Sequence, residues 1–276
     1  AAWEDLATTK TSEFSDSWLT LRDQWRAEIL ERERFNAEHF DTRWDLSGSD
    51  FAVMTRHGVG VTEAPSKPGE FAILPRRDDE RLLNGIYPGG SYTHLLSTKH
   101  AGVIQTPRFR IDSDYISFRT LGENLSFAQL IIENYAVPRG GDGIYKQRYS
   151  PKQDQMVRKR WDTSYWKGFT AYIEFATRDD ATNFRYDEED SKLRNQPIPT
   201  DDGRSSIGAS RILFHDVEDL PRDTILPIDY LLDDEPTSRE ELADLIVQRL
   251  IVAVEAWRDN RLTENAAAFL DEFVRA

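Results

Sequence analysis

Two of the five histidines, His94 and His100, lie six residues apart in a polar stretch that also contains Ser91. A zinc site built on histidines needs a third ligand, and helical pairs usually follow the H-E-x-x-H spacing. This stretch has neither feature. Ser91 lacks the G-x-S-x-G context of a nucleophile. We therefore interpret the region around Pro88 and the two glycines that follow it as a turn, with polar side chains that contact a ligand and do no chemistry.

Carboxylates offer a second kind of chemistry, because the chain contains 49 Asp and Glu residues. Glycoside hydrolysis needs two of them about 5–10 Å apart across a cleft. Glu133, Glu174 and Asp162 lie on or beside predicted strands and are the best candidates. Glu174 alternates with apolar neighbours, so we expect it to face solvent or a concave sheet. Hydrolysis remains a less favoured alternative, since acidic residues are usually solvated.

Oxygen-rich loops favour calcium over zinc, because calcium takes six to eight oxygen ligands in flexible geometry. No EF-hand motif is present. The sequence predicts a structural calcium ion, but no covalently attached cofactor. The candidate ligands come from two acidic loops and are Asp112, Asp114, Asp187 and Asp190.

Aromatic and hydrogen-bonding side chains are typical of carbohydrate recognition, since sugar C–H faces stack on rings and hydroxyls need polar partners. Within "WDTSYWKG", which spans residues 161–168, we expect Trp166 to be a core residue and Tyr165 to be the more exposed ring. The candidate ligand-binding residues are Tyr87, Tyr92, His94, Tyr135, Arg139, Tyr145 and Tyr165.

The composition restricts the possible partners. The formal net charge is −14, which argues against nucleic acid and anionic membranes. The chain contains no cysteine, so thiolate metal sites, iron–sulfur clusters and C-x-x-C-H haem attachment are excluded. No apolar run approaches the roughly 20 residues of a membrane span. Because the first residue is Ala, we expect a mature or excised piece, which leaves targeting open.

The arrangement of apolar residues predicts a mainly β protein with flanking helices. Trp18, Leu21, Trp25 and Ile29 recur at helical spacing, and Asp16 or Ser17 is the expected cap. Short runs rich in β-branched and aromatic residues follow, separated by turn residues. In "FTAYIEFAT", residues 169–177, the alternation places Phe169 on the same face as the three apolar residues that follow at every second position. Such runs indicate an antiparallel jelly-roll sandwich.

Helix returns near the C-terminus, where Ser238 and Glu241 form a capping-box pattern and Thr263 begins a second helix. We expect this helical hairpin to pack against the N-terminal helix. The predicted organisation is an N-terminal helical segment at 1–43, a β-sandwich at 44–216, a linker at 217–236 and the hairpin at 237–276.

Several stretches together resemble one family. They are "GEFAI" (69–73), "GIYPGGSYTHLLSTKHAGVIQTPRF" (85–109), "LIIENYAVPR" (130–139), "WDTSYWKGFTAYIEF" (161–175) and "AVEAWRDNRLTENAAAFLDEF" (253–273). This set resembles the internal sandwich and helical segment of large planctomycete surface proteins, which carry a planctomycete-type cytochrome c domain and helical domains of unknown function. The resemblance implies an extracytoplasmic location and a sandwich similar to carbohydrate-binding modules. Any haem would belong to other parts of such a protein.

These observations favour a non-catalytic module that binds polysaccharide and contacts other domains of its parent chain. The main alternative is a structural spacer that positions the redox and helical domains of the parent. A glycoside hydrolase is the third hypothesis. Nucleic-acid binding and membrane insertion are not expected.

Overall fold

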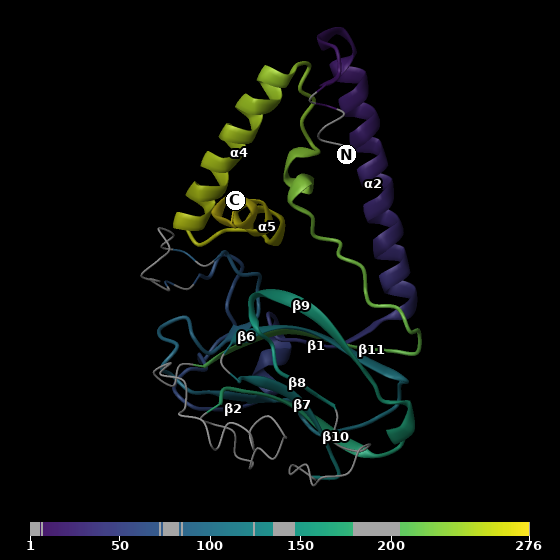
Figure 1. Ribbon diagram of the computed structural model, residues 1–276, viewed down its shortest axis with the longest axis vertical. Coiled ribbons are helices and arrows are strands. Elements are labelled where there is room, and N and C mark those ends of the chain that lie inside the picture. The colour runs from purple at the N-terminus through teal and green to yellow at the C-terminus, as the bar shows by residue number, and fades with distance from the viewer. Residues whose placement is uncertain are drawn as a thin grey trace, which may run out of the picture.

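A computed structural model describes residues 6, 8–71, 73, 83, 85–123, 125–134, 147–178 and 205–275. Two antiparallel sheets pack face to face, and a layer of helices lies over the outer face of one of them (Figure 1). The predicted fold class, a β-sandwich with one N-terminal and two C-terminal helices, is confirmed. None of the helices in the described part of the chain is long and apolar enough to span a bilayer.

The sheet beneath the helices, here called sheet A, has the order β1-β11-β6-β9, and β3 also pairs with β11. The central strand β6 pairs with β9 on one side and β11 on the other, with Ile116 opposite Trp161 and Phe214. The bounds are β1 Asp41–Asp45, β3 Ser91–Tyr92, β6 Tyr115–Glu123, β9 Gln153–Asp162 and β11 Ser206–His215.

The second sheet, sheet B, has the order β2-β4-β10-β7-β8, with β5 also paired to β10. Successive strands of the chain tend to switch between the two sheets, as in a jelly roll. The bounds are β2 Thr55–His57, β4 Val103–Gln105, β5 Phe109–Arg110, β7 Phe127–Ile132, β8 Arg148–Tyr149 and β10 Thr170–Ala176.

Alternation along the strands forms the core between the sheets. Ile173 and Phe175 on β10 point inward from sheet B and are at most 1% exposed. Phe118 on β6 meets them from sheet A, with its ring centroid 5.7 Å from that of Phe175 and 4.4 Å from that of Trp161. Complete burial of each such side chain stabilises the fold by about 1.5–3 kcal/mol. Phe169 is an exception to the prediction, because β10 begins at Thr170 and the Phe169 side chain is 46% exposed.

The N-terminal helix, α2, runs over Phe14–His39, close to its predicted bounds. The predicted cap at Asp16 or Ser17 is wrong. A short 3-10 turn, η1 Thr11–Glu13, leads directly into the helix, and Glu13 at the cap position makes no side-chain capping bond.

The C-terminal helices are α4 Arg239–Arg258 and α5 Glu264–Arg275. Ser238 caps α4, because its hydroxyl accepts the Glu241 N–H at 3.1 Å. The Glu241 carboxylate binds the backbone and side chain of Thr237, one residue before the expected reciprocal partner. The three helices share a small core built on Trp18, Leu242 and Phe269.

The segment from 216 to 236 connects β11 to α4 and runs beside α2 (Figure 1). Hydrogen bonds and an ion pair attach this segment to α2 and to sheet A. Asn36 on α2 donates to the Arg222 carbonyl and accepts the Arg222 N–H, both at 2.8 Å. Arg158 on β9 contacts Asp223 at 2.7 Å, and the Trp18 indole donates to the Asp234 carbonyl at 2.9 Å. This segment therefore fastens the helical layer to sheet A.

Candidate ligand-binding surface

Three of the predicted ligand residues form a buried aromatic cluster. Tyr87 and Tyr92 stack with their ring centroids 5.1 Å apart, and His94 meets Tyr87 edge-on at 5.5 Å. The exposed fractions are 1%, 0% and 4%, respectively. The backbone of Gly208 on β11 makes this possible, since any Cβ at that position would clash with the Tyr92 ring. In this structure the three rings contact one another and not solvent.

Hydrogen bonds hold this cluster in place. Tyr92 donates to the Pro88 carbonyl at 2.6 Å, and His94 Nε2 lies 3.2 Å from the Tyr87 hydroxyl. Burial raises the pKa of both tyrosines and lowers the pKa of His94 to about 4. A neutral, enclosed imidazole with this low pKa is consistent with a structural role for the polar stretch of residues 91–100.

The turn between β9 and β10 separates one buried ring from one exposed ring. The 3-10 turn η3 Ser164–Trp166 begins where the Asp162 carboxylate accepts the Ser164 N–H at 3.0 Å and its hydroxyl at 2.6 Å. Trp166 is 6% exposed and belongs to the sandwich core, whereas Tyr165 is 78% exposed. The predicted difference between these two rings is confirmed.

Phe169 adds a second exposed ring four residues later. Gly168 adopts φ +90°, a conformation that side chains rarely tolerate, and its N–H donates to the Ile111 carbonyl at 2.8 Å. Ile111 returns a bond to the Phe169 carbonyl at 2.9 Å. Because both ends of the turn are tied to the sandwich, Tyr165 and Phe169 are held on a fixed backbone.

The same turn also carries a charged group that pairs with two neighbouring loops. Lys167 Nζ is 2.7 Å from Asp114 and 3.3 Å from Asp216, and the hydrogen bond to Asp114 raises the pKa of Lys167. The Asp114 N–H also donates to Asp216 at 2.8 Å. The surface formed by Tyr165, Phe169 and these three charged residues is called the turn surface below.

The predicted calcium ligands are only partly visible. Asp112 pairs with Arg43 at 3.1 Å, and Asp114 pairs with Lys167, so each carboxylate already has a cationic partner. Among the residues that the structure describes, no group of three or more His, Cys, Asp or Glu side chains is suited to a metal ion. Calcium binding stays a prediction. The predicted residues Tyr135, Arg139, Tyr145, Asp187 and Asp190 lie outside the described residues.

Two of the hydrolase candidates, Glu133 and Glu174, lie well apart on sheet B. Glu174 was expected to face solvent or a concave sheet, but it is 1% exposed, and it accepts a 2.6 Å bond from Gln105. Burial raises its pKa. Glu133 accepts the Thr170 N–H at 2.7 Å. Since Glu174 pairs with Gln129, four residues before Glu133, the two acids are roughly 13 Å apart along the sheet, beyond the usual catalytic range.

A set of arginines on the outer face of sheet A was not identified from the sequence. Arg119, Arg158, Arg160 and Arg211 come from three neighbouring strands and face the helical layer. In its strand, each of these arginines is at a position where the alternation of side chains predicts that it points away from the sandwich core. The sequence could not reveal that these strands are adjacent, so it gave no sign of the gathered positive charge.

No family model matches the chain, and no curated protein sequence matches it. Several solved structures are distantly similar. A family 29 carbohydrate-binding module complexed with cellulohexaose is 15% identical with a TM-score of 0.32, over 63% of this chain and 89% of that one. A family 61 module in complex with β-1,4-galactotriose is 8% identical with a TM-score of 0.31, over 62% and 94%. A cleaved adhesin domain of Lys-gingipain from Porphyromonas gingivalis is 10% identical with a TM-score of 0.31, over 64% and 98%.

The sandwich is thus distantly similar to carbohydrate-binding modules and to adhesin domains. At these identities the likeness concerns the fold alone. The choice of ligand has to be argued from the surface of this chain.

Proposed function

We propose that the chain is a non-catalytic polysaccharide-binding module and that the turn surface contacts the sugar. The observation that carries the proposal is the pair of exposed rings, Tyr165 and Phe169, within five residues of a turn tied to the sandwich core. Large rings normally withdraw from water, and an exposed ring on a fixed backbone offers area for ligand contact.

The chemistry of the turn surface suits a sugar. The C–H face of a pyranose packs on an aromatic ring, and the ring gains stacking energy with little conformational cost because only two torsions are fixed. Lys167, Asp114 and Asp216 supply charged hydrogen-bond donors and acceptors from the same turn and its two neighbouring loops. A preformed turn also lowers the entropy lost on binding.

The test uses the variants Tyr165→Ala and Phe169→Ala on a glycan array, followed by calorimetric titration of any sugar retained by the wild-type chain. Both variants should lose binding and keep the wild-type melting temperature. Leu96→Ala is the matched control, because Leu96 is 83% exposed elsewhere on the surface. Full binding by both variants would place the ligand elsewhere, and no binding to any glycan by the wild-type chain would refute the proposal.

Trp166→Ala separates recognition from folding. Trp166 is 6% exposed and lies in the sandwich core. Its removal should cost about 3–5 kcal/mol of unfolding free energy. A stable Trp166→Ala variant that no longer binds sugar would mean that Trp166, and not Tyr165, is the recognition ring.

A structural spacer is the second candidate, and the fastened helical layer favours it. Sheet A, the 216–236 segment and α2 are joined by Arg158–Asp223 at 2.7 Å and by the two Asn36–Arg222 bonds at 2.8 Å. A spacer has to hold a fixed geometry. Spin labels placed at exposed sites on α2 and on sheet B should then give one narrow distance distribution, whereas a broad distribution would argue against this role.

The wider context is also a proposal. The motifs resembling planctomycete surface proteins support an extracytoplasmic location, as one segment of a larger chain that carries cytochrome c and helical domains. Structural calcium at the loop of Asp112 and Asp114 belongs to the same proposal.

A further inference from the structure

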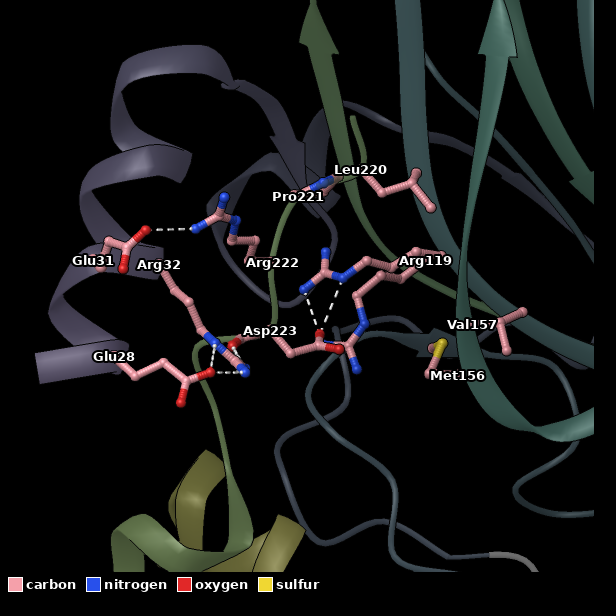
Figure 2. Close-up of a pocket in the computed structure, with 11 residues that line it drawn as sticks. Glu28, Glu31, Arg32, Arg119, Met156, Val157, Leu220, Pro221, Arg222 and Asp223 are labelled. Atoms are coloured by element: carbon pink, nitrogen blue, oxygen red, sulfur yellow. Dashed lines mark hydrogen bonds and ion pairs between the residues drawn. The ribbon is translucent and has the colours of Figure 1, made fainter. Parts of the chain in front are cut away.

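A cleft separates the outer face of sheet A from the helical layer. It consists of two adjoining cavities of about 790 and 260 Å³, which share Arg119, Met156, Arg158 and Asp223. Figure 2 shows the larger cavity, with α2 on one side, the β9 residues Met156 and Val157 on the other, and Arg119 reaching in from the sheet. The smaller cavity continues toward α5. The combined space accommodates a small organic molecule.

The arginines of this sheet face mostly have carboxylate partners. Arg158 contacts Asp223 at 2.7 Å and Arg160 contacts Glu218 at 3.3 Å. Arg211 contacts Asp45 at 3.0 Å. The first two pairs join sheet A to the segment that leads to the helices, and the third joins β11 to β1 within the sheet.

Arg119 differs from these neighbours. It lies directly opposite Arg158 in the β6–β9 ladder, yet it forms no hydrogen bond or ion pair with any described residue. Its Nε is buried without an acceptor. The chain has 49 acidic and 35 basic residues, so carboxylates are in excess overall. Arg119 is half-buried and lines both cavities, and a guanidinium with five donors and no acceptor among the described residues is a ready site for an anion.

The surroundings define the rest of the ligand. The smaller cavity has apolar parts at Ile86, Leu226 and Ala267, a carboxylate at Glu264, and the ion pair of Asp271 with Arg275 at 2.8 Å. The Glu264 carboxylate accepts the Gly89 N–H at 3.0 Å, and burial raises its pKa. Acidic side chains in such a wall accept hydrogen bonds from hydroxyl groups. The cleft therefore suits a small molecule that carries several hydroxyl groups and one anionic group.

We propose that Arg119 anchors a small hydroxylated organic anion, such as a sugar acid or a sugar sulfate or phosphate, in the cleft between sheet A and the helical layer. The guanidinium fork binds the oxyanion, and the acidic wall receives the hydroxyls. This site is separate from the turn surface, so the two proposals stand or fall independently.

The test titrates the full chain with glucuronate, glucose 6-sulfate and glucose 6-phosphate, with glucose as the neutral probe and sodium chloride matching the ionic strength. Binding is measured by calorimetry, and the Arg119 side-chain Nε–Hε signal is followed by NMR. At least one anion should bind and shift that signal, whereas glucose should not. The compound that binds shows whether the site prefers a carboxylate, a sulfate or a phosphate.

Two variants sharpen the result. Arg119→Met should weaken anion binding roughly tenfold or more, because a charge-assisted contact is lost. Arg160→Met is the matched control, since Arg160 lies on the same sheet face and lines neither cavity, and it should bind as the wild type does. Without ligand, Arg119→Met should melt no lower than the wild type, because Arg119 has no ion pair with a described residue and its buried Nε has no acceptor to lose.

Three outcomes would overturn the proposal. The first is that no anion binds. The second is equal weakening by Arg119→Met and Arg160→Met, which would indicate nonspecific attraction to the basic face. The third is a lower melting temperature of Arg119→Met together with an unmoved Arg119 Nε–Hε signal, which would indicate a purely structural arginine.

Discussion

His94 makes the stability of the fold depend on pH. Its side chain is 4% exposed, and Nδ1 is buried without a hydrogen-bond partner. Burial disfavours the imidazolium and lowers the pKa of His94 from 6.5 to about 4. The unfolded chain therefore binds this proton at a higher pH than the folded chain does. The contribution of His94 is complete above about pH 6.5 and is lost as the pH falls toward 4.

The size of this effect follows from proton linkage. With a pKa of 6.5 in the unfolded chain and about 4 in the folded chain, the free energy of unfolding falls by about 1.4 kcal/mol on going from neutral pH to 5.5, and by about 3 kcal/mol at pH 4. Burial also lowers the pKa of His215, whose contribution has the same sign. The acid sensitivity of the wild-type chain should thus exceed the share of His94 alone.

The assay is urea unfolding followed by tryptophan fluorescence at a series of pH values from 7.5 to 4. His94→Gln should have a lower stability at neutral pH and a flatter dependence on pH than the wild type. His57→Gln is the control, because it makes the same His-to-Gln substitution at an exposed position. If wild type and His94→Gln lose stability in parallel below pH 6.5, the assignment of a buried neutral imidazole is wrong.

Two further predictions concern the helical core and the metal. Trp18→Ala should lower the unfolding free energy by about 3–5 kcal/mol, since Trp18 is 0% exposed and donates to Asp234; Leu30→Ala, at a 65% exposed position of the same helix, should change it little. A variant with both Asp112→Asn and Asp114→Asn should abolish any calcium-dependent rise in melting temperature, because a ligand that binds only the folded state stabilises it. If millimolar calcium leaves the wild-type melting temperature unchanged, the calcium prediction fails.

The sandwich could be predicted because the pattern that marks each strand lies within a few consecutive residues of the sequence. Alternation in the β6 and β10 segments shows which side chains face inward, and these faces do meet between the sheets. Phe169 marks the limit of this reasoning. The same alternation extends to it, but Gly168 turns the backbone and the strand begins one residue later. A periodic pattern does not reveal where a strand starts.

Ligand contacts were harder to predict because exposure depends on distant partners. Tyr92 looks like a surface residue in its polar turn, but β3 pairs with β11 and the ring packs against Gly208, more than a hundred residues away. Arg119 is an ordinary outward residue of a strand until β9 places Arg158 beside it. Such sites arise from strand order, which neither composition nor spacing determines.

The clamp between Asn36 and Arg222 has a consequence for how the chain tolerates changes in length. A proline-containing connection such as residues 216–236 would ordinarily accept insertions and deletions. Here one side chain binds both the N–H and the carbonyl of a single residue, at 2.8 Å each. Adding or deleting one residue between β11 and Arg222 would bring a different residue opposite Asn36 and also displace Asp223 from Arg158. The spacing from β11 to Arg222 is therefore as restricted as that of a paired strand.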